Sequence, residues 1–167
     1  KMKSFISSKV KLKKSKIGKG LFWIKKIKKG ELIINYYLKA PGKFLCFKDY
    51  EQLYKNGFDY DLQIGNDIFF APINKKELEQ ADFINHSCDP NCGTKDSLKI
   101  VALRNIKPGK EITFDYTMSE SSNYRIKCKC DSKNCRKVIT GNDWKIKSLQ
   151  KKYKEFFSDY LKIRGLI

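Results

Sequence analysis

The sequence predicts a mainly β protein with a few helices. Short runs of β-branched and aromatic residues dominate the first two-thirds of the chain, and Gly, Pro and Asn residues separate these runs. Helical spacing of apolar residues is confined to a few segments. At 167 residues the chain is most simply one domain, long enough to bury roughly two-thirds of the surface that it exposes when unfolded.

The predicted strands all precede residue 117. Gly65-Asn66 separates two of them and indicates a hairpin turn. The segment Lys107-Pro108-Gly109-Lys110 is a turn of the type that accepts Pro followed by Gly. The predicted strands are Val10–Lys13, Leu21–Ile24, Glu31–Leu38, Tyr60–Ile64, Ile68–Ala71, Leu98–Arg104 and Glu111–Tyr116.

Three helices are predicted. Lys48–Asn56 has apolar residues at helical spacing and is followed by Gly57, which favours termination. Asn74–Ala81 begins with a capping Asn and has Glu77 three residues later, close to a capping box. The last helix is predicted from about Asp143 to Ile163. Its apolar stripe is expected to pack against the domain and consists of Leu149, Tyr153, Phe156, Phe157, Tyr160 and Leu161.

The charge is large and unevenly placed. The net charge is +18, with nets of +14 for residues 1–48, −5 for residues 49–82 and +9 for residues 83–167. The excess of Lys suits either nucleic-acid binding or an ordinary solvated surface. The acidic segment suits either solvated helices and a hairpin or attraction of a Lys-rich peptide. Its acids are Asp49, Glu51, Asp59, Asp61, Asp67, Glu77, Glu79 and Asp82.

The six cysteines favour metal over disulfides. Cys128, Cys130 and Cys135 form a C-x-C-x4-C cluster, which needs a distant fourth ligand to complete a tetrahedral zinc site. Cys88 and Cys92 are the candidates, and Cys46 is expected to be a buried apolar residue. No signal peptide and no apolar run of roughly 20 residues is seen, so a soluble protein in a reducing compartment is expected.

Three motifs together carry a family resemblance. The chain resembles SET-domain protein lysine methyltransferases with a zinc-binding post-SET tail, over roughly residues 9–144. The same order and approximate spacing are seen in Asn85-His86-Ser87-Cys88-Asp89-Pro90-Asn91, in Thr113-Phe114-Asp115-Tyr116 and in the C-x-C-x4-C-R tail that ends at Arg136. Gly18-Lys19-Gly20-Leu21-Phe22-Trp23, followed by Lys29-Gly30-Glu31, resembles the opening of the family.

The resemblance implies an organisation for the chain. The expected fold is the SET (β-clip) fold, in which small sheets wrap around a pseudoknot, with a post-SET zinc site and a C-terminal helix. Residues 1–8 are expected to be frayed, residues 9–120 to form the SET domain, residues 124–140 to form the post-SET zinc segment and residues 141–167 to form the helix. The insert at about 48–82 is expected to form one wall of the substrate groove.

The resemblance also implies catalytic residues. Tyr116 corresponds to the catalytic tyrosine, although a Tyr at a strand end is ordinarily a packing residue. Tyr60 corresponds to a tyrosine that lines the lysine channel. Phe114 lies where the family carries Phe or Tyr, and Phe there implies products beyond monomethyl lysine. Only a neutral amine attacks, and a dry channel beside a sulfonium lowers the pKa of lysine from about 10.4, so no dedicated carboxylate base is expected.

The implied cofactors are S-adenosylmethionine, which becomes S-adenosylhomocysteine, and Zn²⁺. A lone Gly-x-Gly is usually only a turn, and a single His in a polar loop usually forms structural hydrogen bonds. Their assignment to the cofactor site therefore depends on their positions within the family motifs. The cofactor is expected to contact backbone groups of Lys19, Gly20 and Leu21 together with Trp23, Asn85 and His86. The expected zinc ligands are Cys88, Cys128, Cys130 and Cys135, with Cys92 as the competing fourth ligand.

The expected activity is methyl transfer to a lysine of histone tails or of another Lys-rich protein. The expected state is a monomer, with a dimer left open. The alternatives are an inactive SET module that binds peptide or chromatin, and a basic zinc module that binds nucleic acid. A eukaryotic protein would be nuclear; a bacterial one would be cytoplasmic or a secreted effector reaching the host nucleus. Family departures are Asn35 for Glu, Asp82 for Arg and Lys137 for Gly, and the Thr140–Trp144 tail resembles bacterial forms.

Overall fold

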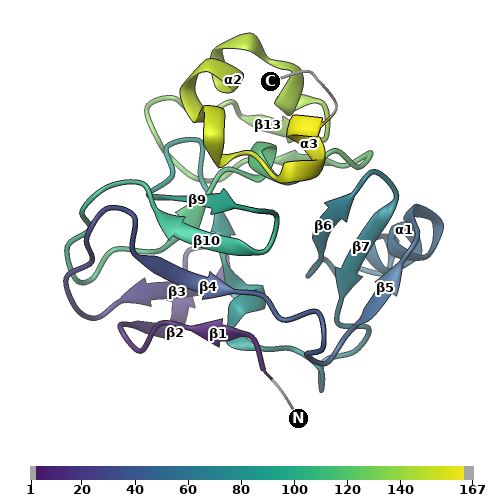
Figure 1. Cartoon of the computed structure of the whole chain (residues 1–167), viewed down its shortest axis with the longest axis horizontal. Coiled ribbons are helices and arrows are strands. Elements are labelled where there is room, and N and C mark those ends of the chain that lie inside the picture. Colours follow the sequence, from purple (N-terminus) through teal and green to yellow (C-terminus); the bar gives the residue numbers. More distant parts are fainter. Residues whose placement is uncertain (1–2, 164–167) are drawn as a thin grey trace.

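The computed structural model describes residues 3–163 and confirms the prediction of a mainly β protein. Five small sheets surround the core of the described part, and the short C-terminal helices lie together at one end of the molecule (Figure 1). The largest sheet has the strand order β1-β4-β10-β9, with neighbours antiparallel. Its strands are β1 (Phe5–Ile6), β4 (Leu32–Asn35), β9 (Cys92–Lys95) and β10 (Lys99–Ala102).

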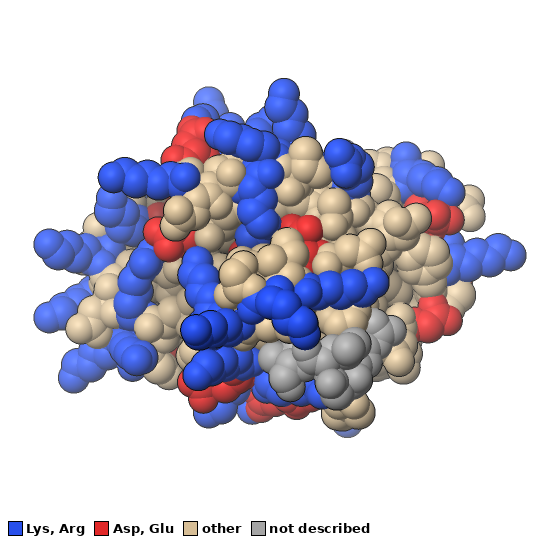
Figure 2. All heavy atoms as spheres, turned by 90° about the horizontal axis from the view of Figure 1, so that it is seen from above, with Lys and Arg blue, Asp and Glu red and all other residues tan. Residues whose placement is uncertain are grey.

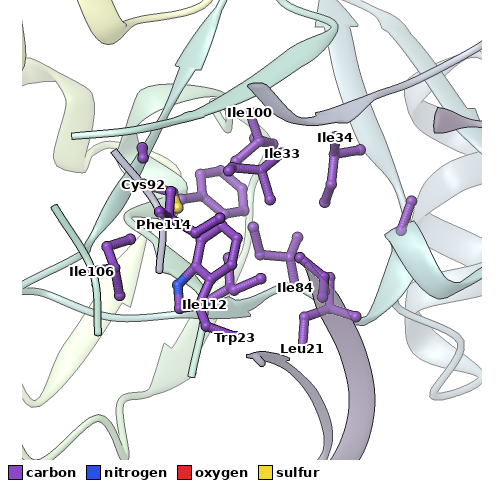
Figure 3. Close-up of a cluster of buried hydrophobic side chains, with 14 residues drawn as sticks. Leu21, Trp23, Ile33, Ile34, Ile84, Cys92, Ile100, Ile106, Ile112 and Phe114 are labelled. Atoms are coloured by element: carbon purple, nitrogen blue, oxygen red, sulfur yellow. The ribbon is translucent and has the colours of Figure 1, made fainter. Parts of the chain in front are cut away.

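The main hydrophobic core lies between this sheet and a hairpin. The hairpin consists of β2 (Val10–Ser15) and β3 (Gly18–Trp23), which pair along their full length. Large side chains with no more than 1% exposure fill the space between them (Figure 3), and burial of this apolar area is the main term that stabilises the fold. These side chains include Leu21, Trp23, Ile33, Ile34, Ile100 and Ile112.

The insert forms a separate unit beside the main sheet (Figure 1). It contains a three-stranded sheet of order β5-β7-β6, and the ring of Tyr50 stacks on Phe69 with centroids 4.3 Å apart. The predicted hairpin between β6 and β7 is present, but its turn is Asn66-Asp67 rather than Gly65-Asn66, because Gly65 still pairs with Ile68. The predicted first helix is confirmed within a residue at each end. The elements are β5 (Lys43–Leu45), α1 (Phe47–Lys55), β6 (Leu62–Gly65) and β7 (Ile68–Ala71).

Two segments that are far apart in the sequence meet in a short parallel pair. β8 (Asn85–His86) pairs with β11 (Thr113–Phe114), and the Ser87 amide donates to the Phe114 carbonyl at 3.0 Å. The predicted strand Glu111–Tyr116 is therefore much shorter, because the 3₁₀ turn η2 (Tyr116–Met118) begins immediately after Asp115. This turn places Tyr116 at the end of the crossing.

The prediction of one continuous C-terminal helix is wrong. Lys154 has φ +36, which interrupts the helix, and the Ser158 amide donates to the Met118 carbonyl at 2.7 Å. The break lets Tyr153, Phe157 and Leu161 all pack on Met118 and Trp144, so the expected apolar contact with the domain is confirmed. The elements are β12 (Arg125–Lys127), β13 (Val138–Thr140), η3 (Asp143–Lys145), α2 (Lys147–Tyr153), η4 (Lys154–Phe156) and α3 (Asp159–Ile163).

The predicted helix Asn74–Ala81 is also wrong. The Asn74 side chain accepts from the Lys76 amide at 3.0 Å, and the Glu77 carboxylate accepts from the Ile73 amide at 2.9 Å. These local bonds satisfy the backbone of a single turn, so no α-helix follows. The chain instead continues into the 3₁₀ turn η1 (Gln80–Phe83), and then becomes extended to enter β8.

In the N-terminal segment expected to be frayed, Phe5–Ile6 form β1 and pair with β4. Residues 1–2 of that segment and residues 164–167 of the expected C-terminal helix lie outside the described residues. Two smaller expectations are corrected. Tyr60 precedes the strand that it was predicted to open. Cys46 is exposed rather than buried, since it lies at the N-cap of α1. Within residues 3–163, no helix has the length and apolar character that a membrane span requires.

Candidate active site and metal centre

Tyr116 is held by backbone and ring contacts at the β8–β11 crossing. Its amide donates to Nδ1 of His86 at 3.2 Å, and its hydroxyl donates to the Ile84 carbonyl at 3.3 Å. Its ring centroid lies 5.1 Å from those of both His86 and Phe114. Burial, together with the nearby carboxylates Asp59, Glu120 and Asp61, raises the pKa of Tyr116 well above its ordinary value. The hydroxyl therefore stays protonated and can orient a substrate rather than act as a base.

Two cavities meet at Tyr116. The first, which we call the cofactor cleft, has a volume of about 1040 Å³ and is lined by Gly18, Lys19, Phe83, Asn85 and His86 together with the tail around Cys128–Cys130. The second, which we call the acidic pocket, lies on the side of the insert. Residues lining both are Asp59, Tyr60, Glu79, Asp82, Ile84, Tyr116 and Ile126. Tyr116 and Tyr60 thus lie where the two cavities join, whereas Phe114 lines only the acidic pocket.

The predicted cofactor residues divide into two groups. Lys19, Asn85 and His86 line the cofactor cleft, and the Asn85 amide donates to the Lys19 carbonyl at 3.0 Å. Gly20, Leu21 and Trp23 are not among the residues that line this cleft, and the side chains of Leu21 and Trp23 are 0% and 1% exposed in the core. A cofactor contact of these three residues stays a prediction.

Gly20 has a packing role that explains why a residue without a side chain lies there. A Cβ at this position would collide with the Glu111 carboxylate and would lie 2.8 Å from Nδ2 of Asn85. Glu111 in turn accepts from Asn85 at 2.6 Å and from the Ser15 hydroxyl at 2.8 Å. Sequence reasoning did not identify Glu111, although its position just before Thr113-Phe114-Asp115-Tyr116 was a usable signal.

His86 joins Tyr116 to the cysteine cluster. Burial lowers the pKa of His86 to about 4, and the Asp115 carboxylate only partly opposes this effect, so the imidazole is neutral. Because Nδ1 accepts from the Tyr116 amide, the proton must be on Nε2. Nε2 lies 3.3 Å from Sγ of Cys88 and is therefore the donor of that contact.

The cysteine cluster has the dimensions of a tetrahedral metal site. The Sγ atoms of Cys88, Cys128, Cys130 and Cys135 all lie within 4.8 Å of one another, and the Cys88–Cys128 distance is 3.8 Å. Zinc bound to sulfur at about 2.3 Å in a tetrahedron requires S–S distances of about 3.8 Å. Cys92 is buried in the main core and is absent from the cluster. The structure therefore brings Cys88, and not Cys92, to the three tail cysteines, and the four could hold a metal ion.

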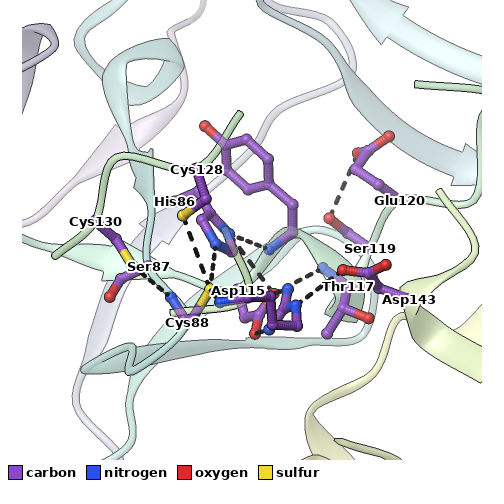
Figure 4. A network of polar contacts seen from close by, with 12 residues as sticks. His86, Ser87, Cys88, Asp115, Thr117, Ser119, Glu120, Cys128, Cys130 and Asp143 are labelled. Atoms are coloured by element: carbon purple, nitrogen blue, oxygen red, sulfur yellow. Dashed lines mark hydrogen bonds and ion pairs between the residues drawn. The ribbon is translucent and has the colours of Figure 1, made fainter. Parts of the chain in front are cut away.

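A buried ionic network ties the tail to the segment before Tyr116 (Figure 4). The Arg136 guanidinium donates two hydrogen bonds of 2.7 Å to the Asp115 carboxylate and one of 2.9 Å to Asp143. The Tyr153 hydroxyl also donates to Asp115 at 2.9 Å, and Asp115 is 0% exposed. Loss of one partner of such a buried pair costs roughly 3–5 kcal/mol. Sequence reasoning placed Asp115 and Arg136 in motifs but assigned neither of them this contact.

Comparisons with known proteins agree with this arrangement. The family model of the SET domain matches residues 18–117, which is more than half of the chain. Histone-lysine N-methyltransferase trithorax of Drosophila virilis is 33% identical over 130 residues, covering 73% of this chain and 3% of that protein. Histone-lysine N-methyltransferase ASHH2 of Arabidopsis thaliana is 30% identical over 142 residues, covering 76% and 8%.

A solved structure supports the same conclusion. A chain of apo ctPRC2 with a doubly substituted Ezh2 superimposes with a TM-score of 0.52 at 25% identity, covering 64% of this chain and 15% of that chain. The chain thus spans only a small fraction of the length of the relatives that it matches. The family model, the curated relatives and the common fold show that the chain belongs to the SET-domain family.

Proposed function

We propose that this chain is a protein-lysine methyltransferase that uses S-adenosylmethionine as methyl donor and releases S-adenosylhomocysteine. The observation that carries this proposal is the position of Tyr116 where the cofactor cleft joins the acidic pocket. An in-line displacement needs the donor and the acceptor amine to meet in a fixed orientation, and two adjoining cavities that share Tyr116 in their linings would hold one substrate each.

The residues around Tyr116 would have separate roles in cofactor binding, substrate binding and orientation of the amine. Lys19, Asn85 and His86 would hold the cofactor, which when bound supplies an electrophilic methyl group on a sulfonium. Tyr60 and Phe114 would wall the lysine channel, and their rings exclude water from it. The protonated Tyr116 hydroxyl would orient the amine lone pair toward the cofactor cleft, and the proton that leaves the amine would pass to solvent or to a carboxylate of the acidic pocket.

The direct test is transfer of labelled methyl from S-adenosylmethionine onto a panel of core histones and a mixed cell extract. Label on a protein band is expected, with methyl-lysine identified by mass spectrometry, and prior acetylation of the lysines should remove it. Absence of label from folded, zinc-loaded protein would favour a module that binds peptide or chromatin without chemistry. DNA binding with steep salt dependence and no cofactor effect would favour a nucleic-acid module.

Phe114 is expected to set the number of methyl groups transferred. Its ring is 7% exposed, lines the acidic pocket and lies 5.1 Å from Tyr116, so a hydroxyl added to it would crowd the amine. We expect exhaustive reaction of the wild type to give products beyond monomethyl lysine, and Phe114→Tyr to stop at an earlier product. Mass spectrometry of a single-lysine peptide checks both. Purely monomethyl product from the wild type would contradict this assignment.

We also propose that Cys88, Cys128, Cys130 and Cys135 hold a structural zinc ion. Four thiolates close the coordination shell, which is typical of structural sites and leaves no open position for chemistry. The tail from β12 to β13 would then be fixed beside the cofactor cleft, to which Cys128 and Cys130 also belong. The thiolate charge is offset by the Arg136 amide, which donates to Sγ of Cys88 at 3.4 Å, and by Nε2–H of His86.

Histone tails are the proposed substrates, since the curated relatives are named histone-lysine methyltransferases. A nuclear site of action follows if the source is eukaryotic. Figure 2 shows Lys and Arg side chains spread over the end of the molecule that carries the C-terminal helices. We propose that this basic end contacts nucleic acid when the substrate is a nucleosome.

Charge reversal tests this contact. Lys147→Glu combined with Lys151→Glu on α2 is expected to lower methylation of nucleosomes several-fold while leaving free histone peptides unaffected, because both residues are exposed and lie outside the cavities. Lys25→Glu with Lys26→Glu, just after β3, is the matched control. An equal loss of nucleosome methylation in both double variants would show that only the total charge matters. No loss in either double variant would refute the contact.

A further inference from the structure

The acidic pocket has an unusual lining for a chain with net charge +18. The described residues that line it include five carboxylates and six tyrosines, and none is Lys, Arg or His. Aromatic faces together with carboxylates favour alkylammonium groups, through cation–π attraction and charge-assisted hydrogen bonds. The carboxylates are Asp59, Asp61, Glu79, Asp82 and Glu120, and the tyrosines are Tyr36, Tyr50, Tyr54, Tyr60, Tyr116 and Tyr124.

Two buried polar atoms in this pocket lack a partner. Tyr124 is 6% exposed, and its hydroxyl has no hydrogen-bond partner among the described residues. Oδ2 of Asp61 is equally buried and equally unpaired within residues 3–163. Buried polar groups in folded proteins are almost always hydrogen-bonded, so two orphaned groups that line the same pocket point to a ligand.

Three of these carboxyl groups have no cationic partner among the described residues. None of the ion pairs formed within residues 3–163 involves Asp59, Asp61 or Glu120. Glu120 is 9% exposed, and its Oε1 accepts only long bonds of 3.4 Å from the Gln63 amide and the Ser119 hydroxyl. Without a cation, burial favours the protonated form of these acids, so a cation that enters the pocket would replace their protons.

We propose that Asp61 and Glu120 form an ammonium subsite that binds a protonated lysine side chain of the protein substrate. The assignment of a protein substrate rests on the proposed function, whereas the subsite rests on the pocket. Since Tyr116 lines the same pocket, an ammonium held there lies beside the site of methyl transfer. The subsite is a positioning and specificity device that selects a cationic side chain. If that side chain is the methyl acceptor, its ammonium must pass a proton to a pocket carboxylate or to solvent before the neutral amine attacks.

The subsite makes substrate binding depend on pH. Burial, followed by repulsion from Asp59, raises the pKa of Asp61 to about 8, and burial and Asp61 raise the pKa of Glu120. The tyrosines that face them are Tyr36, Tyr50, Tyr54, Tyr116 and Tyr124, and all have raised pKa values, so they stay neutral. A bound ammonium favours the ionised carboxylates. Binding therefore releases protons, and affinity should rise as the pH increases toward 8 and above.

The test is peptide affinity measured by fluorescence anisotropy without cofactor. Asp61→Asn and Glu120→Gln should each weaken a peptide with a single lysine about tenfold, the effect of losing one charged hydrogen bond. The matched control is Glu51→Gln, which removes a carboxylate of the same acidic segment that pairs with Lys55 and lies outside the pocket. The same peptide with norleucine for lysine should bind weakly and equally to all variants.

Two further comparisons show which lysine of the substrate supplies the ammonium and distinguish failure of the subsite from failure of the proposed function. If the variants weaken only peptides with a second lysine, the subsite takes a residue beside the target; if the single-lysine peptide is affected, it takes the target itself. Asp61→Asn should also flatten the pH dependence and raise the melting temperature, whereas a structural role predicts a lower one. Wild-type affinity for the lysine peptides in both Asp61→Asn and Glu120→Gln would overturn the proposed subsite. Lysine-dependent binding without methyl transfer would overturn the proposed function alone.

Discussion

Tyr116→Phe is expected to lower kcat for methyl transfer by at least about a hundredfold while leaving KM for the peptide within a few-fold of wild type. The hydroxyl is the group that would orient the amine, and misplacement of a reacting group by about 1 Å can cost about a hundredfold in rate. The ring contacts with His86 and Phe114 do not use the hydroxyl, so the fold should persist. The lost bond to the Ile84 carbonyl costs only about 1 kcal/mol.

Single-turnover kinetics with labelled cofactor provide the measurement. Tyr37→Phe is the matched control, because Tyr37 is 41% exposed and lies outside both the cofactor cleft and the acidic pocket. A Tyr116→Phe rate within about threefold of wild type would remove Tyr116 from the catalytic role. A large rise in KM with unchanged kcat would instead assign the hydroxyl to ground-state binding.

Much of the site could be predicted because its residues lie in contiguous motifs. Asn85, His86 and Cys88 fall within seven residues, and Tyr116 closes a four-residue motif, so the resemblance located them without any tertiary information. Spacing alone left Cys88 and Cys92 as alternatives. The structure separates them, because Cys92 belongs to β9 and points into the main core.

Residues whose role depends on tertiary contacts could not be predicted. Glu120 lies outside the acidic segment in the sequence, and only folding brings it to the same pocket as Asp61. The expectation that no dedicated carboxylate base is needed stays a prediction. The contact between Tyr153 and Asp115 spans 38 residues and has no local signature. Apolar spacing marked Tyr153 only as a packing residue.

The fold shows the same division between local and tertiary information. The longer strands and α1 carry clear periodicity and turn residues, and they were predicted within a few residues. Strands of two residues, such as β8 and β11, are too short to show a sequence pattern. They form only because the folded chain brings the two segments side by side. The C-terminal helix was predicted too long because the interruption at Lys154 serves packing on Met118, which no local signal records.

The cysteine cluster and Tyr116 are connected through His86, and this connection would give the proposed zinc ion a role in activity without a chemical one. One imidazole nitrogen accepts from the Tyr116 amide at 3.2 Å, and the other donates to Sγ of Cys88 at 3.3 Å. A cysteine that loses its metal can move or take up a proton, and it then holds the imidazole less firmly. The Arg136 amide, which donates to the same sulfur, would lose its position as well.

Removal of the zinc is therefore expected to lower methyl transfer at least about a hundredfold and to release the tail from β12 to β13, because metal binding energy is folding energy for such a segment. Methyl-transfer rates and hydrogen exchange of residues 124–140, measured before and after chelation with verified metal content, check both effects. Readdition of zinc should restore them.

Cys88→Ser should reproduce the chelated state in the presence of zinc. Cys46→Ser is the matched control, since Cys46 is exposed and lies outside the cluster, and it should retain both metal and activity. Full activity of a protein shown to be free of zinc would break the proposed link from Cys88 through His86 to Tyr116. Rapid hydrogen exchange in the tail with an unchanged methyl-transfer rate would show that the metal stabilises only the tail. The position of Tyr116 would then depend on the Asp115–Arg136 network and not on the metal.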